Sequence, residues 1–141
     1  MKEKSGQGTG LGIMNKVFVI AEAGVNHNGN LETAKRLVDE AAGAGADAVK
    51  FQTFRAESLV CADAEKAAYQ KETTDREETQ YAMLKRLELT EGMHRELLER
   101  CREKKIVFLS TPFDIESIRY LAGLDMPVFK IPSGEITNLP Y

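Results

Sequence analysis

The sequence predicts an α/β fold in which parallel strands alternate with helices. Short β-branched and aromatic runs recur along the chain, and apolar residues at helical spacing lie between them. This alternation is typical of a parallel sheet joined by right-handed crossovers. The expected strands are residues 17–21, 48–53, 106–110 and 128–131.

Three amphipathic helices are expected between these strands, over residues 31–42, after residue 90 and after residue 114. Their ends are predicted from side chains that cap a first turn and from glycines that follow a last turn. The capping residues are Asn30, Thr90 and Asp114, and the stops are Gly43 or Gly45 and Gly123.

Residues 54–89 are polar and longer than a simple connection. They predict an excursion that carries one or two helices, and segments of this length are often functional. Its place after the second strand suggests a mobile lid or an interface element above a site.

The spacing of the strands indicates a barrel. Strands recur about every 37 residues, and eight such units match the ~250 residues or more of a (β/α)8 TIM barrel. A small open sheet is the alternative, but four strands alone leave two apolar edges uncovered. We therefore predict that residues 16–141 hold the first four βα units of a TIM barrel, after a flexible leader at residues 1–15.

Composition excludes several classes of function. The 141 residues include 19 basic and 22 acidic side chains, so the net charge of −3 argues against a nucleic-acid partner. No apolar run approaches the ~20 residues that span a bilayer, and the first residues lack the apolar core of a signal peptide. We expect a cytoplasmic protein in which Cys61 and Cys101 are partly buried thiols, because two cysteines make no disulfide framework.

Polar side chains gather where each expected strand ends. In a barrel the active site lies at the carboxyl ends of the strands. The period of two places Lys50 and Gln52 on one face, and Val49 and Phe51 then face the helices. The candidate site residues are Glu22, Asn26 and His27 after the first strand, Lys50 and Gln52 on the second, Thr111 after the third, and Lys130, Ser133 and Glu135 on and after the fourth.

The two lysines carry the chemical argument. A lysine within an apolar strand must be paired or lose its proton. One alternative is a structural ion pair with Glu22 or Glu135, in which the carboxylates only balance charge. The other is an anion site, in which lysines and hydroxyls bind a phosphate or carboxylate and the carboxylates serve in acid/base catalysis or bind sugar hydroxyls. Two lysines on alternate strands favour an anionic, phosphorylated substrate.

The histidines suggest little by themselves. His27 lies in a turn-forming run and is expected to be a turn residue, and His94 is expected to be solvated on a charged helix face. No spacing of His, Cys, Asp or Glu predicts a metal site within this chain.

Four sequence motifs follow one another along the chain: Ile20–Gly24 with Asn26–Gly29, Ala48–Thr53, Phe108–Asp114, and Phe129–Glu135. A fifth, shorter motif is Met83–Lys85 followed by Leu87–Leu89. In this order they resemble the sialic acid synthase family, which includes N-acetylneuraminate, legionaminate and pseudaminate synthases. The resemblance covers about residues 16–141.

The resemblance implies a transferase of carbohydrate and polysaccharide biosynthesis. Such enzymes condense phosphoenolpyruvate with an N-acetylated amino sugar of the N-acetylmannosamine type. The products are a nine-carbon, sialic-acid-like ulosonate and phosphate. A divalent metal, Mn²⁺ or Mg²⁺, polarises the sugar aldehyde.

The resemblance also implies roles for single residues. Lys50, Thr111, Lys130 and Ser133 would hold phosphoenolpyruvate, Gln52 and Glu135 would contact the amino sugar, and Glu22 would transfer a proton or position water. Catalytic roles fall on Glu22, Lys50 and Glu135, and Asn26 and His27 join the substrate-binding set.

Family members are longer than this chain. The resemblance places the metal-binding histidines, the remaining barrel and a C-terminal antifreeze-like domain outside residues 1–141. It also implies a homodimer for the full-length form and no turnover by residues 1–141 alone. The alternatives are a related 3-deoxy-ulosonate synthase, an aldolase that forms a Schiff base on Lys50 or Lys130, and a non-catalytic half barrel.

Overall fold

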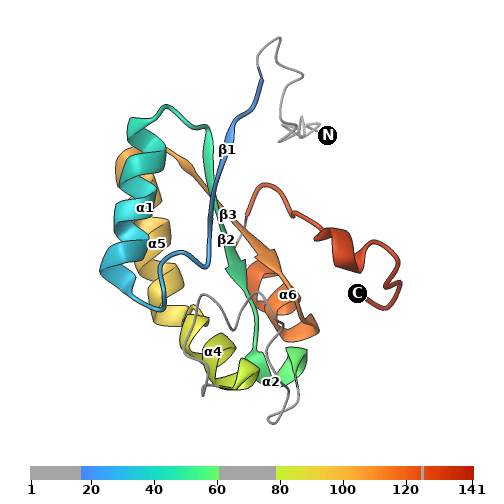
Figure 1. The fold of residues 1–141 in the computed structure, drawn as a ribbon. Coiled ribbons are helices and arrows are strands. Elements are labelled where there is room, and N and C mark those ends of the chain that lie inside the picture. Colours follow the sequence, from blue (N-terminus) through green and yellow to red (C-terminus); the bar gives the residue numbers. More distant parts are fainter. Residues whose placement is uncertain (1–16, 61–78, 125) are drawn as a thin grey trace, which may run out of the picture.

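The computed structural model describes residues 17–60, 79–124 and 126–141. Its strands β1 (Ile20–Gly24), β2 (Ala48–Thr53) and β3 (Val107–Pro112) form one parallel sheet in the order β1-β2-β3 (Figure 1). The predicted α/β class with parallel strands is therefore confirmed. The expected leader and Cys61 lie outside the described residues.

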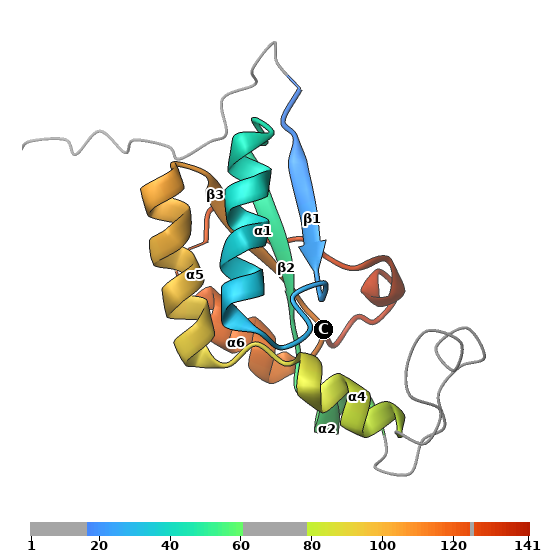
Figure 2. The same cartoon turned by 60° about the vertical axis from the view of Figure 1, so that its left-hand side comes forward.

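Two long helices cover one face of this sheet. Helix α1 (Leu31–Gly43) follows β1, and α5 (Glu91–Lys104) precedes β3. Figure 2 shows both helices on one side of the sheet and the end of the chain, around residues 133–139, on the other side. We call the side away from α1 and α5 the open face.

The core lies between the sheet and these helices. Val49 and Phe51 of β2 pack with Phe108 of β3, and the Phe51 and Phe108 rings stack with centroids 5.8 Å apart. Val38 of α1 and Leu97 of α5 complete the same cluster with no exposed surface. The predicted period of two is thus confirmed, since Val49 and Phe51 face the helices.

The predicted caps form as expected. The side chain of Asn30 accepts from the Thr33 amide at 2.9 Å, and Thr90 accepts from the Met93 amide at 3.2 Å. Asp114 begins α6 (Ile115–Ala122) by accepting from the Ser117 amide at 2.7 Å. These bonds satisfy amide groups that have no partner in the first turn of a helix.

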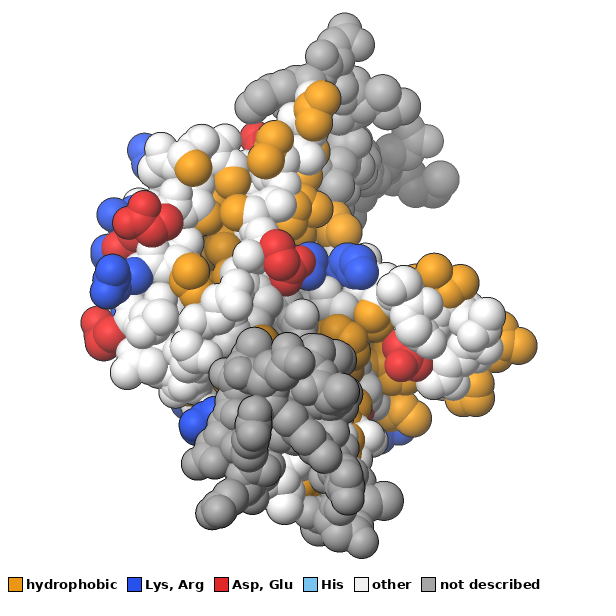
Figure 3. All heavy atoms as spheres, viewed as in Figure 1, with side chains coloured by type: hydrophobic (Ala, Val, Ile, Leu, Met, Phe, Trp, Pro, Cys, Tyr) orange, Lys and Arg blue, Asp and Glu red, His pale blue; other side chains and the backbone are white. Residues whose placement is uncertain are grey.

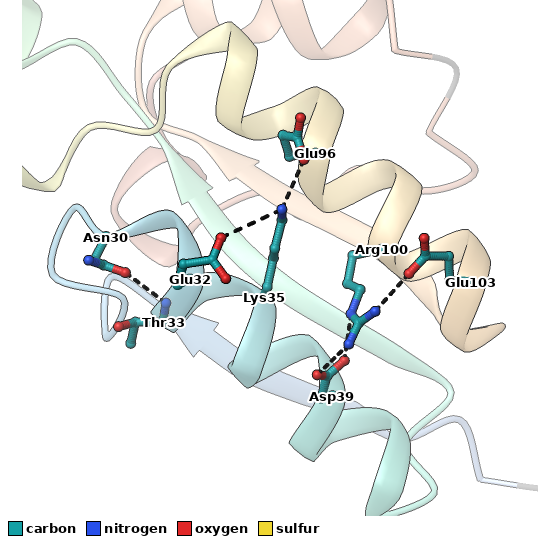
Figure 4. Close-up of polar contacts among 8 residues, drawn as sticks. All are labelled: Asn30, Glu32, Thr33, Lys35, Asp39, Glu96, Arg100 and Glu103. Carbon is teal, nitrogen blue, oxygen red and sulfur yellow. Dashed lines mark hydrogen bonds and ion pairs between the residues drawn. The ribbon is translucent and has the colours of Figure 1, made fainter.

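Ion pairs fasten α1 to α5 on their outer surfaces (Figure 4). Lys35 of α1 donates a hydrogen bond to the Glu96 carboxylate at 2.9 Å. Arg100 of α5 donates to both carboxylate oxygens of Asp39, at 2.7 and 2.8 Å. The Arg100 hydrogen bonds lower the pKa of Asp39. A two-pronged arginine–carboxylate pair fixes orientation as well as distance, so the helices are held in register.

The excursion after β2 contains two helices in its described part, as expected. These are α2 (Ala56–Leu59) and α4 (Gln80–Leu87), and Glu88 joins them by accepting from the Ala56 amide at 2.7 Å. Residues 61–78 lie outside the described residues. The lid role stays a prediction. Within the described ranges, no helix is long and apolar enough to cross a membrane.

The first and third strands differ from the sequence prediction at both ends, since β1 is Ile20–Gly24 rather than residues 17–21 and β3 is Val107–Pro112 rather than residues 106–110. The first strand begins at Ile20 rather than Val17, because its register with β2 starts at the pair Ile20 and Ala48. The third extends to Pro112 rather than Ser110, because the Phe113 amide donates to the Thr53 carbonyl at 3.0 Å. Pairing with the neighbour, rather than local composition, sets both ends.

The prediction of a fourth strand at Val128–Ile131 is wrong for this structure. The segment is not paired with β3, and the only regular element after α6 in the described residues is a short 3-10 helix, η1 (Ser133–Glu135). Prolines at 127 and 132 flank the run and cannot donate to a ladder. An outermost strand also gains hydrogen bonds along one edge only, and Phe129 and Ile131 of this run remain exposed.

Candidate active site

The candidate site lies on the open face, where polar side chains alternate with the helix-facing core residues. Glu22 of β1 is the register partner of Lys50 of β2, and Gln52 of β2 is the partner of Thr111 of β3. The structure therefore brings four of the predicted residues together on three adjacent strands. Figure 3 shows acidic and basic side chains adjoining near the centre of the view, beside the C-terminal segment.

Lys50 and Glu22 form an ion pair across the first two strands. The Lys50 side chain is 10% exposed, whereas the Glu22 side chain is 54% exposed. This pair is the structural partnership that the sequence left open for one of the lysines. Because Glu22 reaches water, the pair can open toward an anionic ligand without leaving its carboxylate unsolvated.

Gly24 leaves room for the Glu22 and Gln52 side chains at the end of β1. The glycine ends β1 with φ of +53°, and a Cβ there would lie 3.3 Å from Glu22 Oε1 and 3.7 Å from Gln52 Nε2. A side chain at this position would be strained and would crowd both groups. The glycine thus leaves a carboxylate and an amide side by side at the end of β1.

Thr111 offers a buried hydroxyl that has no partner in the described part of the chain. The residue is 1% exposed, and its Oγ1 has no hydrogen bond to any described group. An unsatisfied buried hydroxyl is costly, so such groups call for an explanation. On the open face beside Lys50 and Gln52, a bound ligand would supply the missing bond.

The loop after β1 places its two candidates differently. Asn26 is exposed, whereas His27 has no exposed surface and packs 6.2 Å from the Phe51 ring. The His27 Nδ1 accepts from the Gly29 amide at 3.0 Å, which confirms its turn role, and burial lowers its pKa. Only Asn26 reaches solvent for contact with a substrate.

The candidates after the third strand do not join the sheet. Lys130 and Ser133 are exposed and Glu135 is partly buried. Lys130 and Glu135 line a pocket of about 620 Å³ together with Pro112, Ile118 and Tyr141. This separation follows from the absence of the fourth strand.

His94 corrects the sequence prediction of a solvated surface residue. It has no exposed surface, and its ring lies 5.1 Å from Tyr120 in an edge-on contact. The missed signal was its spacing, because His94, Leu97 and Cys101 fall at i, i+3 and i+7 on the buried stripe of α5. Cys101 is buried as expected, and burial raises its pKa to about 12.

The described residues do not fit a divalent metal. No group of three His, Cys, Asp or Glu side chains gathers among them. Both ring nitrogens of His94 are engaged in hydrogen bonds, and His27 is enclosed in the core. A family-type metal would need ligands from elsewhere.

Comparison with known proteins gives consistent matches. Residues 37–141 match the model of the NeuB family. The chain is 53% identical over 128 residues to N,N'-diacetyllegionaminic acid synthase of Campylobacter jejuni, covering 91% of this chain and 38% of the relative. It is 56% identical over 124 residues to the synthase of the same name from Legionella pneumophila, covering 88% of this chain and 35% of the relative.

A solved structure supports the same relationship. The N-acetylneuraminic acid synthetase of Leptospira borgpetersenii, crystallised with citrate, matches with a TM-score of 0.70 and 34% identity. The match covers 92% of this chain and 42% of that one. The chain thus spans well under half the length of the relatives that it matches.

Proposed function

The chain belongs to the NeuB family, and we propose that residues 16–141 form the N-terminal half of the barrel of a sialic-acid-like synthase. The proposed reaction joins phosphoenolpyruvate to an N-acetylated amino sugar and yields a nine-carbon ulosonate and phosphate. The names of the relatives, which are legionaminic and neuraminic acid synthases, support this reaction class. We refer below to the complete enzyme as this chain together with the rest of that barrel.

One observation carries the proposal. The open face presents a nearly buried ammonium group, Lys50, and a buried hydroxyl without a partner, Thr111. This pair of donors suits a phosphate or carboxylate group, because charge-assisted hydrogen bonds to oxyanions are the strong ones. Phosphoenolpyruvate carries both kinds of group, and a cationic floor offsets the cost of desolvating them.

The proposed steps use the residues of the open face. Carbon 3 of phosphoenolpyruvate attacks the sugar aldehyde, water adds at carbon 2, and the resulting tetrahedral intermediate expels phosphate by cleavage of its C–O bond. Lys50 stabilises the charge on the departing phosphate. Glu22, which is half exposed beside Lys50, positions or deprotonates the water. Gln52, next to Glu22, contacts the amino sugar.

Further groups complete the proposal outside the sheet. Lys130 and Ser133 would add to the phosphoenolpyruvate contacts, and Glu135 and Asn26 to those of the amino sugar. The Lys130 and Glu135 side chains line one pocket, which supports placing the two substrates next to one another there. A divalent metal would be held by residues beyond this chain.

The proposed setting is that of a cytoplasmic homodimer with two small-molecule substrates. Residues 1–141 alone would not turn over, because the sugar and metal sites need the other half of the barrel. A longer synthase structure is similar across 92% of this chain, which supports the proposal that the remaining sites lie in the other half of the barrel.

The test is product formation by the complete enzyme. We expect phosphoenolpyruvate and one of a panel of N-acetylmannosamine-type sugars to give a nine-carbon ulosonate by mass spectrometry, with one phosphate released per product. Glu22→Gln should reduce the turnover number, whereas Glu96→Gln, a control on the outer surface of α5, should not. A pyruvate adduct trapped on the protein by borohydride would instead indicate an aldolase, and no product from any sugar would refute the synthase.

A further inference from the structure

A chain of buried hydrogen bonds lies directly behind the open face. The hydroxyl of Thr53 on β2 lies 2.7 Å from the hydroxyl of Ser110 on β3 and 2.8 Å from Nε2 of His94 on α5. The other ring nitrogen, Nδ1, lies 2.9 Å from the carbonyl oxygen of Thr90. Thr53, His94 and Ser110 are 5% exposed or less.

The chemistry of the groups fixes which one donates and which one accepts in each of these hydrogen bonds. The Thr90 carbonyl can only accept, so Nδ1 of His94 carries a proton. Burial lowers the pKa of His94, so the ring is neutral and Nε2 accepts. The Thr53 hydroxyl must then donate to Nε2, which leaves its oxygen to accept from the Ser110 hydroxyl. Each of these side-chain groups has a defined role as donor or acceptor.

These hydrogen bonds join β2 and β3 near their carboxyl ends, where both strands carry residues of the site. Thr53 follows Gln52 and Ser110 precedes Thr111, and Gln52 and Thr111 are register partners on the open face. Successive side chains of a strand point to opposite faces. The hydrogen bonds on the helix side therefore control the backbone that presents Gln52 and Thr111 on the other side.

Thr111 has particular need of such control. Its Oγ1 has no hydrogen-bond partner among the described residues, so no such bond fixes where this hydroxyl lies before a ligand binds. An apolar contact behind the strand would allow small shifts along it, whereas hydrogen bonds weaken steeply with misalignment.

We propose that His94 is a positioning residue for the ligand-binding face. Through Thr53 and Ser110 it holds the ends of β2 and β3 so that Thr111 and Gln52 meet phosphoenolpyruvate and the amino sugar in the required geometry. This role rests on the proposed function, since it assigns His94 to the substrate contacts of that site. His94 itself touches neither substrate.

The variants separate hydrogen bonding from packing. His94→Phe keeps a ring beside Tyr120 and Phe108 but removes both hydrogen bonds. Thr53→Val removes the central hydroxyl at nearly constant shape, and it disturbs the fold less if His94→Phe fails to fold. His94→Gln places an amide oxygen where Nε2 lies and can accept from Thr53. Leu97→Ala, one turn along α5 and fully buried, is the matched control for lost stability.

Two measurements test the proposal. In the complete enzyme, His94→Phe and Thr53→Val should each raise the KM for phosphoenolpyruvate roughly tenfold, because small misplacements of contact groups are costly. His94→Gln should restore most of the loss. Leu97→Ala should lower the melting temperature at least as much and leave this KM unchanged.

Hydrogen exchange gives a readout that needs no activity. The Phe113 amide donates to the Thr53 carbonyl at 3.0 Å and reports on the joined strand ends. Its exchange should accelerate in His94→Phe and Thr53→Val, but not in Leu97→Ala once global stability is matched with denaturant.

The outcomes distinguish this proposal from the one on which it rests. An inactive parent enzyme refutes the proposed function, whatever the exchange data show. An active parent whose His94→Phe and Thr53→Val variants have KM values and Phe113 exchange no different from those of Leu97→Ala overturns the positioning role of His94.

Discussion

Replacing Lys50 by Met tests whether this lysine binds a ligand or only balances Glu22. Met retains much of the length of the stem and removes the charge. The Glu22 side chain is 54% exposed and remains solvated without its partner. The free energy of unfolding should therefore fall by only about 1 kcal/mol, as for a surface pair. A fully buried pair would lose ~3–5 kcal/mol.

The effect on substrate use should be larger. A charge-assisted contact to phosphoenolpyruvate contributes ~1.5–3 kcal/mol, so its loss raises the KM about ten- to a hundredfold. The KM for the amino sugar should change little, because Lys50 is assigned to the other substrate. The assay is steady-state kinetics of the complete enzyme with each substrate varied in turn, together with a melting curve of each variant.

Lys35→Met is the matched control. Lys35 also forms an ion pair, at 2.9 Å to Glu96, but on the outer surface of α1 away from the open face. It should leave both KM values unchanged. A large fall in the melting temperature of Lys50→Met with an unchanged KM for phosphoenolpyruvate would show that Lys50 is structural, and would refute the anion site.

Three further predictions concern the fold itself. Gly29 has φ of +74°, and a Cβ there would overlap the Arg86 carbonyl, so Gly29→Ala should lower the free energy of unfolding in urea by ~2 kcal/mol or more. Gly43 lies in α1 with open space around it, so Gly43→Ala should be neutral or stabilising by ~0.5–1 kcal/mol. Equal effects of the two would contradict the loop geometry. Cys101, whose pKa burial raises to about 12, should resist iodoacetamide in the folded protein and react on unfolding, as peptide mass mapping would show; rapid labelling of the native protein would contradict its burial. Burial lowers the pKa of His27 and His94 from 6.5, so the unfolded chain takes up protons before the folded chain does as the pH falls. The free energy of unfolding should therefore fall as the pH drops below about 6.5, and it should fall less steeply in His94→Gln. An unchanged slope in that variant would argue that His94 is not buried and neutral.

Local chemistry was sufficient to predict much of this fold. Asn30, Thr90 and Asp114 cap helices because their side chains satisfy amides within three residues, an interaction that depends on no distant part of the chain. The β2 strand was predicted to the residue because it is buried between two neighbours, and so its composition and its pairing agree.

Features that depend on distant partners were predicted less well. The run Val128–Ile131 has the composition of a strand, yet strand formation requires a neighbour and cover that composition does not report. His94 was misplaced because its charged neighbours Arg95 and Glu96 suggested a solvated face. The ring is buried against Thr53, which lies 41 residues earlier in the chain and bonds in turn to Ser110, 57 residues after Thr53.

The candidate site was predictable in part for the same reason. The period of two along β2 placed Lys50 and Gln52 on one face, and the parallel register then brought Glu22 and Thr111 beside them. The chain of hydrogen bonds behind this face was not predicted, because it involves three elements and is visible only once α5 is packed against the sheet.

A crystal structure of the complete enzyme with phosphoenolpyruvate tests most directly whether the open face binds this ligand. We expect phosphate or carboxylate oxygens within hydrogen-bond distance of Lys50 Nζ and of Thr111 Oγ1, the hydroxyl that has no partner among the described residues. A ligand bound elsewhere, with Lys50 still paired only to Glu22 and Thr111 Oγ1 still unpartnered, would contradict it.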